Sequence, residues 1–403
     1  MDRPTPRPDA TAIWLLAVAQ TLGYAGLFYI FGALLLSWEA ALGWSKTTLA
    51  LGPTLSLLVS ASVAPFAGRL VDRGWSVELL TGGTALGALA VASLSLVTMP
   101  AQYLAAWALM GVAHAACLYE VCFAFLIRRL GPQARPAIVK VTLVAGFAST
   151  IAFPVGAGLA EGFGWRAAVA VFALALACGA APANWVAGKR LRRGQPPGRR
   201  PPGTETPEEA RAAFRAARRL PAFWLLATAF GLVAANHAML VSFFLPLFAE
   251  RGASPAMAVA AAATVGPFQV AGRLLLTLGE ARIGARRATS VMLASLLLAA
   301  VVLWLSGLAP ALIFAFAALQ GVAVGLMSIL RPVLTAETLG QRGFGAISGA
   351  IAMAPLLGTA AAPFIGALAF EGAGGQGLIV LAVAMAVVAV ACAVPLLRRP
   401  GAG

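Results

Sequence analysis

The longest polar stretch of the chain, residues 188–221, contains the run Gln195-Pro196-Pro197-Gly198-Arg199-Arg200-Pro201-Pro202-Gly203. Proline and glycine at this density do not continue a helix, and the stretch also holds ten of the 29 Lys and Arg residues. The remainder of the 403-residue chain is strongly apolar, because 61% of all residues are hydrophobic and only 11% are charged. A water-soluble fold needs polar residues over its outside. The sequence therefore indicates a membrane protein that is divided by one polar linker.

Apolar segments lie on both sides of this linker, each near the roughly 20 residues that a membrane-crossing helix needs. They run near 13–37, 47–67, 77–98, 101–126, 137–160 and 167–187, and then near 222–248, 255–279, 288–307, 309–330, 344–369 and 375–397. None alternates in polarity as barrel strands do, and the first carries no cleavage site, so it is expected to be a retained helix.

We therefore expect an all-α integral membrane protein with twelve transmembrane helices in two pseudo-symmetric six-helix bundles. The N-terminal bundle would be 1–187, the cytoplasmic linker 188–221 and the C-terminal bundle 222–403. Thr206–Arg219 in the linker is expected to form an amphipathic helix. The stretch Ala64–Leu70, at the end of the second segment, is echoed by Gly266–Leu274 in the eighth, which supports a duplication.

The basic residues orient the chain. With the N-terminus inside, all of them except Lys46, Arg166 and Arg251 fall on or near the inner side. Both termini are therefore expected in the cytoplasm. Arginine outnumbers lysine 26 to three, a bias of GC-rich bacterial genomes, so the expected location is a bacterial inner membrane.

Several function classes are excluded. The basic residues form no continuous face for nucleic acid, and the four cysteines contain no CxxC pair for a metal or a disulfide framework. Lys46-Thr47 follows Ser45, where a phosphate loop needs glycine. The two histidines lie in different halves and make no hydrolytic site. We expect no enzymatic activity, no cofactor, no metal and no nucleic-acid partner, but a monomer surrounded by membrane lipid.

Twelve spans arranged as six plus six resemble the major facilitator superfamily. The loop after the second segment, Gly68-Arg69-Leu70-Val71-Asp72-Arg73, resembles that family's loop motif, with Gly74-Trp75-Ser76 in place of its basic tail. Gly164-Trp165-Arg166 is another triplet that recurs in the family. The resemblance covers the whole chain and implies a membrane transporter.

The resemblance also implies a gate formed by Gly68, Asp72 and Arg73. In the family, the loop aspartate contacts the start of helix 11 and an arginine of helix 4, and so closes the cytoplasmic side. A carboxylate is favoured at a helix N-terminus, and Arg128 or Arg129 is the expected basic partner. The alternative is that these charges only fix the topology.

The nearest branch by resemblance is that of monocarboxylate transporters and oxalate:formate antiporters. Glu39–Lys46 and Phe125–Arg129 carry this likeness. That branch holds a carboxylate and a proton with an Asp and, four residues later, an Arg in helix 8. Here the two positions are Gln269 and Arg273, and the helix 1 Lys of the branch has no counterpart.

The implied function is symport of a small organic anion with a proton, by rocker-switch alternating access. The alternative is a proton-antiport efflux pump for a drug or metabolite. Trp107 stands where such antiporters carry an arginine in helix 4, and Phe153-Pro154-Val155-Gly156 departs from their helix 5 motif. A receptor or scaffold in the same fold, without transport, is a third hypothesis.

Ionisable groups at membrane depth cost ~3 kcal/mol or more each and need a partner or a function. The guanidinium of Arg273 matches a carboxylate in two hydrogen bonds, or the side chain reaches the interface. Glu120 is expected either to carry the proton or to form a permanent ion pair with Lys140. The expected substrate-binding residues are Arg273, Gln269, Tyr24, Tyr29, His237, Asn236, Gln320 and Arg331, and the expected proton-coupling residues are Glu120, His114 and Lys140. The histidines and the other polar groups are alternatively bonded to neighbouring helices.

Overall fold

The computed structural model describes residues 9–194, 207–340 and 344–398, and every regular element in these ranges is a helix. The first elements are α1 (Ala10–Tyr24), η1 (Ala25–Tyr29), α2 (Ile30–Leu42), α3 (Lys46–Asp72), α4 (Ser76–Leu94), α5 (Pro100–Cys117), α6 (Tyr119–Leu130), η2 (Gly131–Gln133), α7 (Ala134–Ala145), α8 (Ala148–Phe163), α9 (Trp165–Leu174), η3 (Ala175–Ala180) and α10 (Ala181–Gly194). After residue 206 follow α11 (Pro207–Arg219), α12 (Pro221–Glu250), α13 (Pro255–Leu305), α14 (Leu312–Leu339) and α15 (Phe344–Arg398).

Eleven helical stretches among the described residues are long and apolar enough to cross a membrane. The last of them, Ile347–Leu397, has 51 residues and is interrupted at Ala373 and Gly374, so it holds two spans. The count is then twelve. The eleven stretches already include the two spans of α13 separately. These two spans meet at Gly284, whose φ of 67° favours glycine. The predicted fold class is confirmed.

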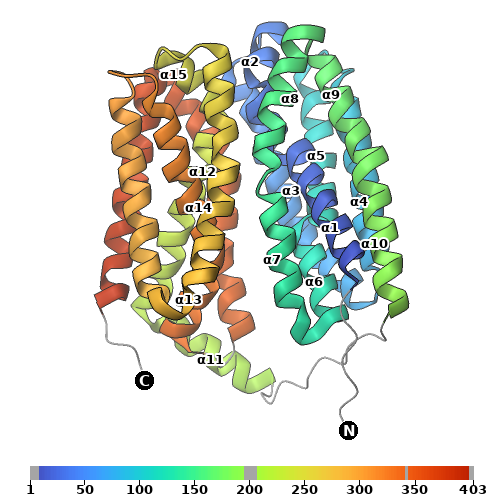
Figure 1. Ribbon diagram of the computed structural model, residues 1–403, viewed down its shortest axis with the longest axis vertical. Helices are drawn as coiled ribbons and strands as arrows, with labels where there is room; N and C mark the ends of the chain where they lie inside the picture. Colours follow the sequence, from blue (N-terminus) through green and yellow to red (C-terminus); the bar gives the residue numbers. More distant parts are fainter. Residues whose placement is uncertain (1–8, 195–206, 341–343, 399–403) are drawn as a thin grey trace. The chain divides into compact units, whose positions relative to one another are not determined.

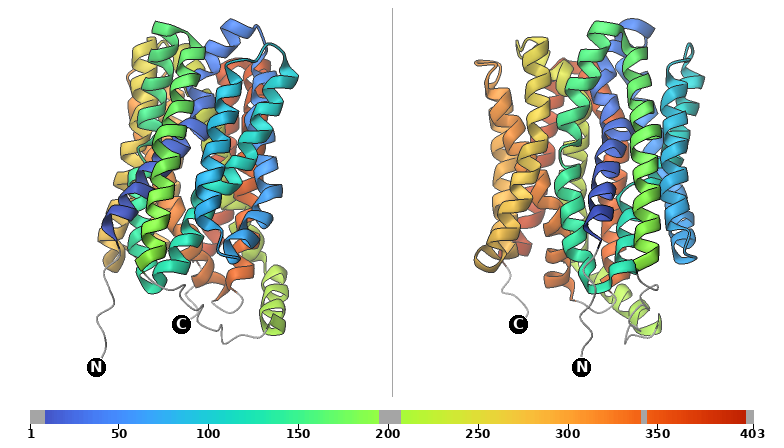
Figure 2. Two further views of the ribbon diagram at one scale, coloured as in Figure 1. Left: turned by 90° about the vertical axis from the view of Figure 1, so that its right-hand side faces the viewer. Right: turned by 45° about the vertical axis from the view of Figure 1, so that its right-hand side comes forward.

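The described helices group into two compact units. Unit 1 contains the described residues up to Ile30 and those from Leu55 to α10, and unit 2 contains Phe31–Thr54 and the described residues from α11 onward. Within each unit the long helices run beside one another (Figures 1 and 2). The expected domain boundaries at the linker stay a prediction. Residues 31–54, which belong to the first half of the sequence, pack with the second half.

The core of unit 1 lies between α1, the end of α3, α4, α6, α7 and α10. Small residues bring α4 against α5. A Cβ placed on Gly83 would lie 2.6 Å from the Cβ of Ala116, and one on Gly87 would lie 3.2 Å from that of Ala113. The close packing that the Gly83-xxx-Gly87 spacing predicts is therefore present.

In unit 2, α13 packs beside α14 and α12 beside α15. Glycines of α14 allow its backbone to touch that of α13. A Cβ on Gly321 would lie 2.5 Å from the carbonyl oxygen of Val265, and one on Gly325 would lie 2.3 Å from that of Gln269. This contact fixes the part of α13 that carries Gln269 and Arg273.

Irregularities interrupt four spans of unit 1, and one of them is the break of the fifth span at Gly146 and Phe147, between α7 and α8. The fourth span breaks at Leu118, where α5 ends and α6 begins. The first and sixth spans each widen into a π-helical turn, η1 and η3. These turns contact each other, because the Cβ position of Gly26 lies 3.1 Å from Leu176. Widened turns inside helices often occur at functional sites.

Candidate functional site

The strongest polar cluster of unit 2 consists of His237 on α12 and of Gln269 and Arg273 on α13. Their exposed fractions are only 8%, 4% and 8%. The Nε2 of Gln269 and the Nδ1 of His237 have no hydrogen-bond partner within the described part of the chain, and the charge of Arg273 acts on His237. Gln269 and Arg273 lie one turn apart on a continuous stretch of helix. The structure thus buries three residues that the sequence singled out and places Arg273 near enough to His237 for its charge to act on the ring.

Asn236 and Gln320, in contrast, are hydrogen-bonded to each other. The Nε2 of Gln320 on α14 donates to the Oδ1 of Asn236 over 3.1 Å, and the Nδ2 of Asn236 donates to the carbonyl oxygen of Ala382 over 2.9 Å. Both side chains are fully buried. The pair connects α12 to α14 and α15 and therefore has a structural role. Arg331 is half-buried in the last third of α14, beside Pro332.

His114 is the central polar residue of unit 1. Its Nε2 lies 3.0 Å from the carbonyl oxygen of Leu27 in η1, and its Nδ1 lies 3.2 Å from the Oγ of Ser56 on α3. Because a carbonyl oxygen only accepts, Nε2 carries the proton, and the neutral ring then accepts from the Ser56 hydroxyl at Nδ1. Both nitrogens are engaged, so His114 joins α5 to α3 and to the π-helical turn.

Tyr24 and Tyr29 lie in a chain of aromatic rings. Tyr24 is half-buried and its ring centroid lies 4.5 Å from that of Tyr119, in the first turn of α6. Tyr29 is buried and meets Phe153 edge-on at 6.3 Å. Tyr24 therefore offers part of its ring at the break of the fourth span, whereas Tyr29 belongs to the core.

Glu120 and Lys140 do not form the ion pair that their positions suggested. Both side chains are exposed, and within the described ranges neither takes part in an ion pair. The break at Leu118 is the physical reason, since it changes the direction of the fourth span just before Glu120. Glu120 lies in the first turn of α6, where the helix dipole favours a carboxylate.

The loop residues of the expected gate lie at the end of α3. Gly68 and Arg73 are exposed, and the side chain of Asp72 lies outside the described residues. Arg128 and Arg129 are half-buried in the last turn of α6.

Sequence reasoning missed a second set of contacts at this end of unit 1. Arg192 on α10 donates to both carboxylate oxygens of Glu78 on α4, over 2.6 and 2.5 Å, and also to the carbonyl oxygen of Gly74 over 2.7 Å. A bidentate pair of this kind fixes orientation as well as position. It therefore holds the loop that follows Asp72 against the end of α10. The only signal in the sequence was an acidic residue in the first turn of a predicted helix.

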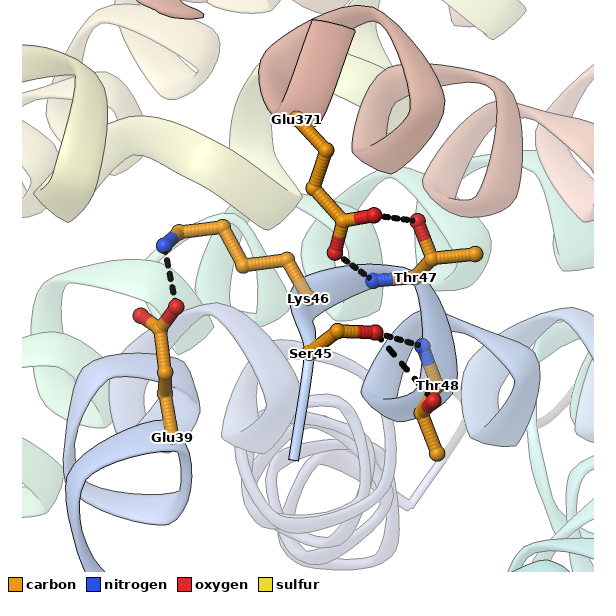
Figure 3. Close-up of polar contacts among 6 residues, drawn as sticks. All are labelled: Glu39, Ser45, Lys46, Thr47, Thr48 and Glu371. Carbon is orange, nitrogen blue, oxygen red and sulfur yellow. Dashed lines mark hydrogen bonds and ion pairs between the residues drawn. The ribbon is translucent and has the colours of Figure 1, made fainter. Parts of the chain in front are cut away.

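Another set of missed contacts lies in unit 2, at the other end of α3 (Figure 3). Glu371 of α15 accepts two hydrogen bonds from Thr47, and Lys46 forms an ion pair with Glu39 of α2. In the sequence, Glu39–Lys46 shows a likeness to one branch of the family but no sign of a structural role.

Comparison with known proteins identifies the family to which the chain belongs. The model of the Major Facilitator Superfamily matches residues 16–354, which is most of the chain. The chain belongs to this superfamily. It is therefore a multi-pass membrane transporter and not an enzyme. No curated protein matches the chain.

Solved structures support the fold. A bacterial homologue of the human lysosomal transporter Spinster, in an inward-facing and occupied conformation, is similar with a TM-score of 0.70 and 15% identity, over 98% of this chain and 97% of that one. The nucleoside transporter NupG is similar with a TM-score of 0.71 and 13% identity, over 96% of this chain and 100% of that one. At these identities the likeness concerns the fold alone.

Proposed function

We propose that this transporter carries a small organic anion, monocarboxylate-like, and that Arg273 binds its carboxylate. The observation that carries the proposal is the buried cluster of Arg273, Gln269 and His237. Gln269 occupies the position where the similar branch has an aspartate, and an amide cannot neutralise the guanidinium. Gln269 therefore does not neutralise Arg273, and its Nε2 can donate to an oxygen of an acid, as can the Nδ1 of His237 when that nitrogen carries the proton.

Proton coupling is the second part of the proposal. Glu120 is the carboxylate we assign to the proton, because it is exposed at the interior break of a membrane span and has no basic partner in the described ranges. A charged side chain at membrane depth faces water or protein rather than lipid. Its exposed surface is thus suited to take up and release a proton.

The transport cycle we propose is alternating access of the two halves, with both termini in the cytoplasm of a bacterial cell. Asp72 would close the cytoplasmic end, as in the similar family motif. The contacts of Arg192 with Glu78 and Gly74 support this role, because they hold the adjacent loop in place.

Efflux by proton antiport is less well supported. Trp107, at the position of the antiporters' arginine, is 1% exposed and packs against Tyr103 with ring centroids 5.9 Å apart. A packed aromatic pair leaves no place for a proton-linked arginine there.

The test is binding of candidate monocarboxylates to the purified, folded transporter. Arg273→Ala should weaken binding by a thirtyfold or greater factor, since losing a buried charged contact costs roughly 2–5 kcal/mol. Arg273→Lys keeps the positive charge but not the two-pronged guanidinium, so it should weaken binding less than Arg273→Ala does. Arg287→Ala is the matched control, because Arg287 is exposed on the same helix and is not among the expected substrate-binding residues. If Arg273→Ala binds a proven anionic substrate as tightly as the parent, the anion assignment fails.

A further inference from the structure

Glu371 makes a contact that joins distant parts of the chain. Its Oε1 accepts from the backbone N–H of Thr47 over 2.7 Å, and its Oε2 accepts from the Thr47 hydroxyl over 2.5 Å (Figure 3). The two residues are 324 positions apart. Thr47 starts the second span, and Glu371 ends the eleventh, just before the interruption at Ala373.

The helix end explains why the contact is strong. The first N–H groups of a helix have no partner inside it. At the start of α3 the N–H of Thr48 donates to the Oγ of Ser45 over 3.1 Å. The N–H of Thr47 is taken by Glu371, whose negative charge also favours the positive end of the helix dipole.

Lys46 strengthens the same junction. It forms an ion pair with Glu39 at the end of α2 and lies 5.2 Å from the ring centroid of Phe370, the neighbour of Glu371. Below this polar layer, Trp38, Leu49 and Ala50 are 0–1% exposed. The ends of the first two spans are thus packed into unit 2.

A second carboxylate in unit 2 uses the same chemistry within one half of the sequence. Glu250, at the end of the seventh span, accepts from the backbone N–H of Gly375 at the start of the twelfth over 2.6 Å. Its neighbour Arg251 donates to the Oε1 of Gln376 over 3.0 Å. Glu250 joins two spans of the same six-helix half, whereas Glu371 joins spans of different halves.

We propose that Glu371 and Thr47 form a latch that closes the transporter at the end of its helices away from the chain termini, and that this latch opens in every transport cycle. The inference rests on the alternating access of the proposed function. In such a cycle, contacts between the two sequence halves at one end must break, while contacts within a half persist. The Glu371 latch therefore opens, and the Glu250 contact stays closed. It joins the same two spans as the expected Asp72 gate, at their other ends.

The test measures access to a buried position beneath the latch and needs no substrate. The four native cysteines are replaced by alanine, and Ala50→Cys serves as the reporter, since Ala50 is buried one turn after Thr47. The full-length protein in liposomes is labelled with a membrane-impermeant maleimide. Glu371→Gln removes the charge from two hydrogen bonds and should speed labelling by about tenfold. Thr47→Ala, which keeps the N–H donor, should have a smaller effect, and Thr47→Ser should label like the parent.

Glu250→Gln is the matched control and should leave the labelling rate unchanged. Equal labelling rates in the parent and in Glu371→Gln would overturn the latch, as would an equal increase in Glu250→Gln. If Glu371→Gln does not fold, the comparison of Thr47→Ala with Thr47→Ser decides. Failure of the latch leaves the binding result for Arg273 untouched, so the two proposals are separable.

Discussion

The proposed role of Glu120 can be tested by measuring transport and its coupling to a proton gradient separately. It is exposed next to the break at Leu118 and has no ion pair within the described ranges. If it carries the proton, Glu120→Gln should abolish accumulation driven by an imposed proton gradient and leave exchange of labelled for unlabelled substrate intact. Both rates are measured in the same proteoliposomes.

Glu161→Gln is the control for that experiment, because Glu161 is also an exposed carboxylate of unit 1 but lies near the end of α8, away from the break at Leu118. Its accumulation should stay close to that of the parent. Equal loss of accumulation and exchange in Glu120→Gln, with folded protein, would instead assign Glu120 to substrate binding or to the structure.

At the residue scale, the sequence predicts candidate polar residues but does not predict the partners of the charges that pair. The sequence singles out Arg273, Gln269 and His237 separately, and the structure places His237 where the charge of Arg273 acts on it. The pairs Arg192 with Glu78 and Glu371 with Thr47 span 114 and 324 positions. No local pattern indicates such contacts, because they depend on how whole helices pack.

At the scale of helices, apolar length predicted the spans, but their interruptions came from packing. Leu118 has neither glycine nor proline beside it, and η1 and η3 contain no polar signal. The π-helical turns are matched by contacts between the spans, such as Gly26 against Leu176 and His114 against the carbonyl oxygen of Leu27. These contacts form only after the helices have associated, so periodicity within one segment cannot reveal them.

The backbone contact between α13 and α14 yields a stability prediction. In Gly325→Ala, the new Cβ would lie 2.3 Å from the carbonyl oxygen of Gln269, so one helix must shift. Overpacking of this kind costs about 1–3 kcal/mol. The variant should unfold at a lower temperature in detergent, and because Gln269 moves, it should also bind substrate more weakly.

Gly349→Ala provides the comparison, since a Cβ at Gly349 meets nothing within 4 Å. Its melting temperature should equal or slightly exceed that of the parent, because alanine favours a helix over glycine. A melting temperature of Gly325→Ala at the level of Gly349→Ala would show that α13 and α14 can separate without cost.

At the scale of the whole molecule, the second and eleventh spans carry a carboxylate contact at one end, and a second such contact is expected at the other end. Glu371 meets the start of the second span in this structure, and Asp72, at the end of the second span, is expected to meet the start of the eleventh. In a two-state cycle, each contact stabilises the state in which its own end is closed. Weakening one contact therefore shifts the population toward opening of that end, and weakening the other shifts it back.

The double variant tests this opposition. Asp72→Asn should slow labelling of Ala50→Cys, because it favours the state in which the Glu371 end is closed. Glu371→Gln should speed labelling, and Asp72→Asn combined with Glu371→Gln should return the rate toward that of the parent. Free-energy shifts at well-separated sites add. The change in the logarithm of the labelling rate in the double variant should therefore equal the sum of the two opposite changes in the single variants. A double variant that labels as fast as Glu371→Gln alone would mean that the two ends are not coupled, and that Glu371 holds only a local closure.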